Sequence, residues 1–66
     1  MLLTVNGEEH VHAGDGTVAA LLAELGAPPE HTAAVVNGKL IHSSRRESFN
    51  LSASDRIEVL TFVGGG

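Results

Sequence analysis

Apolar residues recur with the period of a helix in only one segment of the chain, and they form a single apolar stripe along that helix. In TVAALLAELG, apolar side chains recur three and four residues apart, which places them on one helical face: Val18, Leu21, Leu22 and Leu25. Thr17 is typical of a helix cap, and Gly26 with the prolines after it stops the helix. The pattern predicts a helix over residues 18–25. A lone apolar stripe must be buried, and in so short a chain only a sheet with one apolar face can cover it.

Two Asn-Gly dipeptides divide the rest of the chain into short extended runs. Asn6–Gly7 and Asn37–Gly38 favour β-hairpins, because both central residues of a type I′ turn need a positive φ. Around the first turn, Leu3 and Val5 share one face of a strand. We expect Val11 to point the same way from the return strand, which is otherwise polar and suits a sheet edge.

The chain after the second hairpin is polar until its last apolar run. We expect Phe49 and Leu51 to be isolated core contacts, Ser54–Asp55 to form a turn, and RIEVLTFV to form the final strand. The predicted fold class is α+β in the order ββαββ, a mixed sheet of four to five strands with one main helix packed across it. The predicted core comprises Leu3, Val5, Val18, Leu21, Leu22, Leu25, Val35, Ile57 and Val59.

The composition narrows the class of function. Sixty-six residues predict one domain, over residues 1–63, followed by a flexible tail at 64–66. With no cysteine, the chain has no disulfide and no Cys-based metal site. A net charge of −4 and two aromatic residues argue against nucleic-acid binding. Since no apolar run approaches the ~20 residues of a membrane span and no signal peptide is recognisable, we expect a cytoplasmic protein without membrane contact.

The last strand carries apolar side chains on both of its faces. Side chains alternate along a strand, so if Ile57 and Val59 face the helix, Leu60 and Phe62 face water. Scattered surface apolar residues are common. Two large ones side by side, leading into the tail, instead favour a partner interface of Leu60, Phe62 and Val63.

The tail is three glycines, Gly64, Gly65 and Gly66. One reading is an idle, frayed end or an expression scar. The chemical reading is that an extended backbone without side chains threads a narrow channel in another protein. The terminal carboxylate would then enter an active site, where conversion to an acyl-adenylate makes it open to nucleophiles.

Other candidate sites are weaker. His10 and His12 share a strand face but lack a third metal ligand, so we expect no metal site. Arg45 and Arg46 are interpreted as a solvated pair rather than an anion grip. Gly14–Gly16 reads as a turn rather than a nucleotide loop. We find no catalytic group.

Several short motifs in this order resemble the ThiS family, small sulfur carrier proteins of thiamine biosynthesis in the ubiquitin-like β-grasp group. They are VNG after the first strand, GTVAALLAELG, AAVVNG, an Arg in the following loop, and DRIEVLTFVGGG. The resemblance spans nearly the whole chain. It departs at Ser54–Asp55, where such sequences often have Gly-Asp.

The resemblance implies a carrier and co-substrate rather than an enzyme. A ThiF-like enzyme would use ATP to adenylate the carboxylate of Gly66, with no cofactor bound permanently by the carrier. Sulfur from a cysteine desulfurase-derived persulfide would convert it to a thiocarboxylate. A ThiG-like thiazole synthase would then take that sulfur for the thiazole of thiamine.

Two alternatives stay open at this point. Related carriers serve molybdopterin synthesis (MoaD), cysteine synthesis or tRNA thiolation, and some are conjugated to lysines, so the recipient of the sulfur is not fixed by these residues. The other alternative is a β-grasp interaction module with an inert tail.

Overall fold

The computed structural model describes residues 1–62. The expectations for Val63, Gly64, Gly65 and Gly66 therefore lie outside the described residues. Five strands, one α-helix and two short 3₁₀ turns follow one another along the chain: β1 (Leu2–Val5), β2 (Glu8–Val11), α1 (Val18–Glu24), η1 (Pro29–His31), β3 (Thr32–Val36), β4 (Lys39–Ile41), η2 (Ser43–Arg45) and β5 (Arg56–Thr61).

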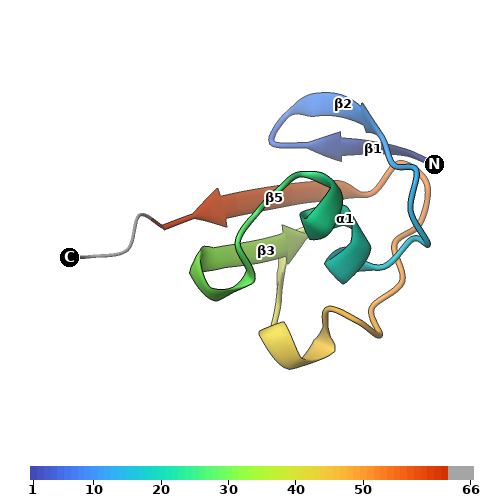
Figure 1. Cartoon of the computed structure of the whole chain (residues 1–66). Coiled ribbons are helices and arrows are strands. Elements are labelled where there is room, and N and C mark those ends of the chain that lie inside the picture. The colour runs from blue at the N-terminus through green and yellow to red at the C-terminus, as the bar shows by residue number, and fades with distance from the viewer. Residues whose placement is uncertain (63–66) are drawn as a thin grey trace.

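The strands form one mixed sheet in the order β2-β1-β5-β3-β4. Strands β1 and β5 are parallel, and the other neighbours are antiparallel. The last strand in the chain thus lies in the centre of the sheet, with a hairpin on either side, and α1 crosses one face (Figure 1). The predicted α+β sheet with one packed helix is confirmed, with five strands.

Both Asn-Gly turns have the predicted backbone. Asn6 and Gly7 have φ of 50° and 82°, and Asn37 and Gly38 have 50° and 84°, which is the pattern of a type I′ turn. This turn twists in the same sense as its flanking strands and so closes each hairpin without splaying it.

The same two asparagines also hold β5, which sequence reasoning did not anticipate. The side-chain amide of Asn6 accepts a hydrogen bond from Val59 N (2.8 Å) and donates one to Val59 O (3.2 Å). The side chain of Asn37 accepts from Arg56 N (2.9 Å) and donates to Asp55 Oδ1 (3.0 Å). Each hairpin is therefore joined to the central strand through its turn as well as through its strand.

The helix begins and ends much as predicted. The side chain of Thr17 accepts a hydrogen bond from Ala20 N (3.1 Å) at the start. The helix ends at Glu24, with Leu25 as its C-cap and Gly26 at φ 71°. Leu25 thus lies past the last helical turn and is 37% exposed, so its place in the predicted core was wrong.

The core lies between α1 and the inner face of the sheet. It contains the predicted Leu3, Val18, Leu21, Leu22 and Ile57, with Val5 and Val59 partly buried at its border. Phe49 packs against it, and Leu51 is buried in it, as expected.

Two further side chains point away from the core. The run AAVV is apolar on both faces of β3, and it is Ala34 and Val36, not Val35, that face the helix. Val11 pairs with the outward-facing Leu2, because His10 takes the position opposite Leu3. Val11 is therefore exposed, and its predicted orientation was wrong.

The backbone at Ser54 explains why similar sequences often have glycine at this position. Ser54 has a φ of 72° in the predicted turn before β5, and glycine adopts this left-handed conformation at no steric cost.

In the part of the chain described here, no helix is long and apolar enough to cross a membrane.

Leu22→Ala tests the core assignment. Leu22 is 4% exposed, so the truncation should lower the free energy of unfolding by roughly 2–5 kcal/mol through lost burial and a cavity. Urea denaturation measures the change. Leu25→Ala, on the same predicted stripe but exposed, is the control and should cost much less; equal losses would contradict the assignment.

Candidate functional site

The end of β5 exposes two large apolar side chains, as predicted. Leu60 is 49% exposed and Phe62 58%, whereas Ile57 on the opposite face is 1% exposed. Their exposure is confirmed; their role as a partner interface stays a prediction. The third predicted interface residue, Val63, lies beyond the described residues.

These side chains belong to a wider apolar area on the face of the sheet away from α1. Across the β3–β5 pair, Leu60 lies opposite the half-buried Ala33, and Val35 lies opposite Leu40 of β4. Leu40 is 65% exposed. We call this set the outer-face strip: Ala33, Val35, Leu40, Leu60 and Phe62. Sequence reasoning missed Leu40, although alternation from the core residue Ile41 would have placed it outward.

The backbone of β5 is held differently on its two sides near its end. On the β3 side, Phe62 N donates to His31 O (2.6 Å), so pairing continues to the last described residue. On the β1 side, Asn6 N donates to Ile57 O (2.9 Å), and the Asn6 side chain pairs with Val59. By alternation, the backbone groups of Thr61 face that side, past the end of β1. A partner strand could pair there.

The two histidines of the discounted metal site are tied to a helix carboxylate. Glu24 Oε1 lies 2.5 Å from His10 Nε2 and 3.0 Å from His12 Nδ1. Gly16 N donates to His12 Nε2 (3.1 Å), so Nδ1 of the buried His12 carries its proton and donates to Glu24. Within residues 1–62, no group of three or more His, Cys, Asp or Glu side chains is arranged so that it could hold a metal ion. The cluster ties β2 and the loop after it to α1.

These contacts make Glu24 unusually acidic. Hydrogen bonds from His10, from the amide of Ala13 and from His12 stabilise its charged form and lower its pKa from 4.5 to about 2. The carboxylate is therefore part of the scaffold, because all its bonds lead to the domain's own residues.

The two adjacent arginines have different roles, so their interpretation as a solvated pair was wrong for one of them. Arg46 is only 8% exposed. Its guanidinium donates to Pro29 O (3.2 Å) and to Thr32 O, while Nε is buried without a partner in the described part of the chain. Arg46 thus fastens the 43–49 segment to the start of β3. Arg45 is exposed.

The acidity of Glu24 predicts a pH dependence of stability. Its lowered pKa contributes stability that is complete above about pH 4.5 and is lost as the pH falls toward about 2. Glu24→Gln should therefore be less stable than the wild type at neutral pH, and the gap should narrow between those limits. Chemical denaturation at a series of pH values measures it. Glu47→Gln, at an exposed carboxylate, is the control; a constant gap for Glu24→Gln would refute the role of the charge.

Comparison with known proteins gives one family. The sequence profile of the ThiS family matches residues 2–66. The crystal structure of the thiamine biosynthesis protein ThiS from Geobacter metallireducens is similar with a TM-score of 0.81 and 32% identity, over the whole of both chains. An NMR structure of a thiamine biosynthesis protein from the same organism gives 0.79 and 32%, over all of this chain and 88% of that one.

Two curated relatives are longer proteins. Thiazole synthases of Paramagnetospirillum magneticum and Magnetococcus marinus are each 35% identical to this chain over all of its 66 residues, which correspond to 20% of each relative. The chain thus spans about a fifth of the length of these relatives. The family profile and the full-length structural match agree with the β-grasp sheet described above, and the chain belongs to the ThiS family.

Proposed function

We propose that the chain is a sulfur carrier whose C-terminal glycine carboxylate becomes a thiocarboxylate and donates its sulfur for the thiazole of thiamine. The observation that carries the proposal is the match of the ThiS family through residue 66, glycines included. The thiazole synthases that contain a matching segment support thiazole synthesis as the destination of the sulfur. The proposal takes Gly66 as the last residue of the working carrier.

The chemistry requires activation, because a free carboxylate resists nucleophiles. A ThiF-like enzyme would join the carboxylate of Gly66 to the AMP part of ATP and release pyrophosphate. The outer sulfur of a persulfide, formed by a cysteine desulfurase, then attacks the acyl carbon and AMP leaves. A thiolate then attacks the desulfurase-side sulfur of the resulting acyl disulfide. It is oxidised to a mixed disulfide with that cysteine, and the S–S bond that breaks leaves the thiocarboxylate on Gly66.

Glycine residues at the C-terminus suit each of these reaction steps. Gly64 and Gly65 have no side chains to obstruct a channel, and Gly66 leaves its carbonyl carbon open to attack. Ordering each residue costs roughly 1–2 kcal/mol, which hydrogen bonds from the partner to the tail must offset. In this proposal the partner enzymes recognise the folded domain and catalyse each step, while the chain supplies the reacting carboxylate. We therefore assign the chain as a co-substrate and not as an enzyme.

Appending one alanine after Gly66 tests the reactive group. The extended chain keeps its fold but lacks the glycine carboxylate, so incubation with ATP, the ThiF-like enzyme and a persulfide donor should give no thiocarboxylate. Deleting Gly66 or replacing Gly65 by Val should also abolish it, through insufficient reach and steric bulk. Thiolation of the uncleaved Ala-extended chain at the wild-type rate would refute the proposal.

The intact mass alone does not identify the thiocarboxylate, because exchanging oxygen for sulfur changes the mass almost as much as oxidising a methionine. The chain has one methionine and no cysteine. A thiol-reactive alkylating reagent should therefore label only the thiocarboxylate, and peptide mass spectrometry should place the label on the C-terminal peptide.

Phe62→Ser tests the outer-face strip as the partner surface. Large apolar side chains near the centre of an interface often contribute 2 kcal/mol or more, so the complex with the ThiF-like enzyme should weaken about tenfold or more. The melting temperature should hardly change, because Phe62 is 58% exposed. Val11→Ser, at a 71% exposed apolar residue on the far edge strand, should leave binding intact. A strong loss of stability in Phe62→Ser would instead place Phe62 in the core.

A further inference from the structure

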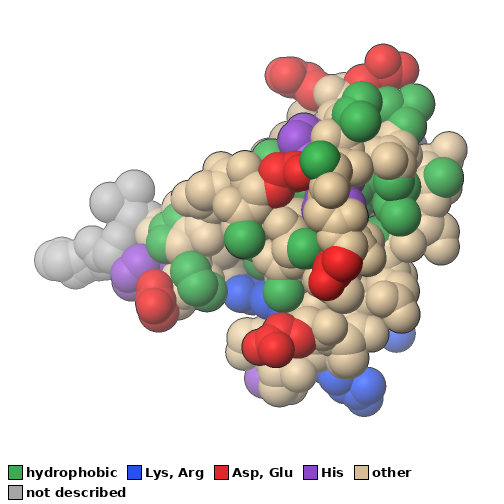
Figure 2. Space-filling model, turned by 45° about the vertical axis from the view of Figure 1, so that its right-hand side comes forward, with side chains coloured by type: hydrophobic (Ala, Val, Ile, Leu, Met, Phe, Trp, Pro, Cys, Tyr) green, Lys and Arg blue, Asp and Glu red, His purple; other side chains and the backbone are tan. Residues whose placement is uncertain are grey.

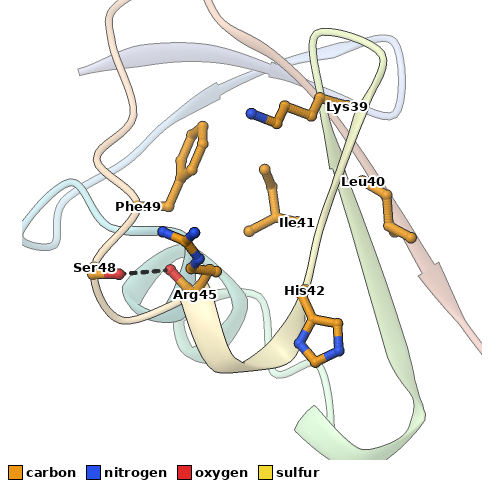
Figure 3. A pocket seen from close by; sticks show the side chains of 7 residues that line it. All are labelled: Lys39, Leu40, Ile41, His42, Arg45, Ser48 and Phe49. Carbon is orange, nitrogen blue, oxygen red and sulfur yellow. Dashed lines mark hydrogen bonds between the residues drawn. The ribbon is translucent and has the colours of Figure 1, made fainter.

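A cleft borders the outer-face strip at the edge of the sheet, where β4 meets η2. Its volume is about 350 Å³. Ile41 and Phe49 form an apolar floor, and Figure 3 shows the side chain of Lys39 reaching over this floor toward Phe49. Arg45 lies on the other side of the floor, and His42 stands at the lower end (Figure 3). We call this the basic cleft.

The charge of the basic cleft is opposite to that of the chain. The net charge is −4 with only four Lys and Arg in total, yet Lys39 and Arg45 both line the cleft and no Asp or Glu does. Figure 2 shows acidic side chains scattered over the visible face, whereas most blue side chains gather at its lower end.

Neither of these two cations has an acidic counterion among residues 1–62. Among residues 1–62, the ion pairs are those of Glu24 with His10 and His12. Neither Lys39 nor Arg45 donates a side-chain hydrogen bond in that part of the chain, unlike the buried Arg46. Two like charges that share one cleft repel each other, so an anion placed between them would be stabilised by both.

The basic cleft and the outer-face strip meet at the edge strand β4. Leu40 lines the cleft and also belongs to the strip, opposite Val35. Strand β4 is the edge of the sheet and has three residues. Lys39 and Ile41 alternate with Leu40 and therefore point to the helix side of the sheet. A protein that covers Leu60 and Leu40 thus reaches the cleft by extending around this short edge strand.

We propose that the basic cleft receives a carboxylate-bearing segment of the protein that docks on the outer-face strip. The inference rests on the proposed function for the identity of that protein, the ThiF-like adenylating enzyme. Apolar contacts on the strip would hold the complex, and one or more Asp or Glu side chains would lie between Lys39 and Arg45. Charges at the rim of an interface act mainly on the association rate and on partner choice.

Charge reversal tests this assignment. Arg45→Glu and Lys39→Glu should each lower the association rate with the ThiF-like enzyme about tenfold at low salt, measured by stopped-flow fluorescence or surface plasmon resonance. The wild-type rate should fall as salt is added, and the variants should depend on salt less steeply. Thermal melting should show both variants folded, because both side chains are exposed.

A charge-balanced variant separates a local effect from the net charge. Arg45→Glu combined with Glu9→Arg restores the net charge, with the new cation on β2 at the opposite edge of the sheet. Slow association should persist in this double variant. Recovery of the wild-type rate would assign the effect to overall charge and overturn the cleft assignment.

Other outcomes also overturn it. Variants that associate as fast as the wild type, with the same salt dependence, would show that no acidic segment enters the cleft. Saturable NMR shifts at the cleft with inorganic phosphate as the probe, together with unchanged association, would make it a small-anion site. If the charge-reversal variants associate normally while the wild type is thiolated, the proposed function stands and only this inference is refuted. If the wild type neither binds the ThiF-like enzyme nor becomes thiolated, both are refuted.

Discussion

The structure depends on how β5, the last strand in sequence, is held in the middle of the sheet. It pairs with β1 in parallel and with β3 antiparallel, and the side chains of Asn6 and Asn37 add hydrogen bonds from both turns. Buried backbone groups must be paired to avoid a desolvation cost, and a strand paired on both sides meets this demand. The strand that carries the tail is therefore anchored by two hairpins, although neither is adjacent to it in sequence.

The single helix determines which face of the sheet is left uncovered in the described structure. A seven-residue helix can cover only one side of a five-stranded sheet, so the opposite side faces solvent. Leu60 and Phe62 lie on that side at the end of β5, and alternation alone requires this once Ile57 is buried. Leu40 lies on the same side, and the basic cleft opens around the edge of β4, beside the inward-facing Ile41. The proposed recognition surface thus includes the end of the strand that leads in sequence to the three glycines.

The sequence predicted the features governed by local rules. The type I′ turns follow from Asn-Gly, the cap from Thr17, and the exposed end of β5 from alternation after Ile57. The failures have a common cause, since Val11, Leu25 and Val35 are apolar residues where local pattern permits either side. Their positions are decided by strand register and by where the helix ends. Arg46 and the Glu24 cluster were missed because their partners lie 11 to 17 residues away, beyond the reach of any periodicity.

The most direct test of the account is to follow the sulfur itself. The carrier would be loaded with isotopically labelled sulfur as the thiocarboxylate, freed from the donor, and mixed with a ThiG-like thiazole synthase and its other substrates. The account predicts that label appears in the thiazole product and leaves the carrier in equal amount, as mass spectrometry of both would show. Thiazole formed without label, or label retained on the carrier while product accumulates, would contradict it.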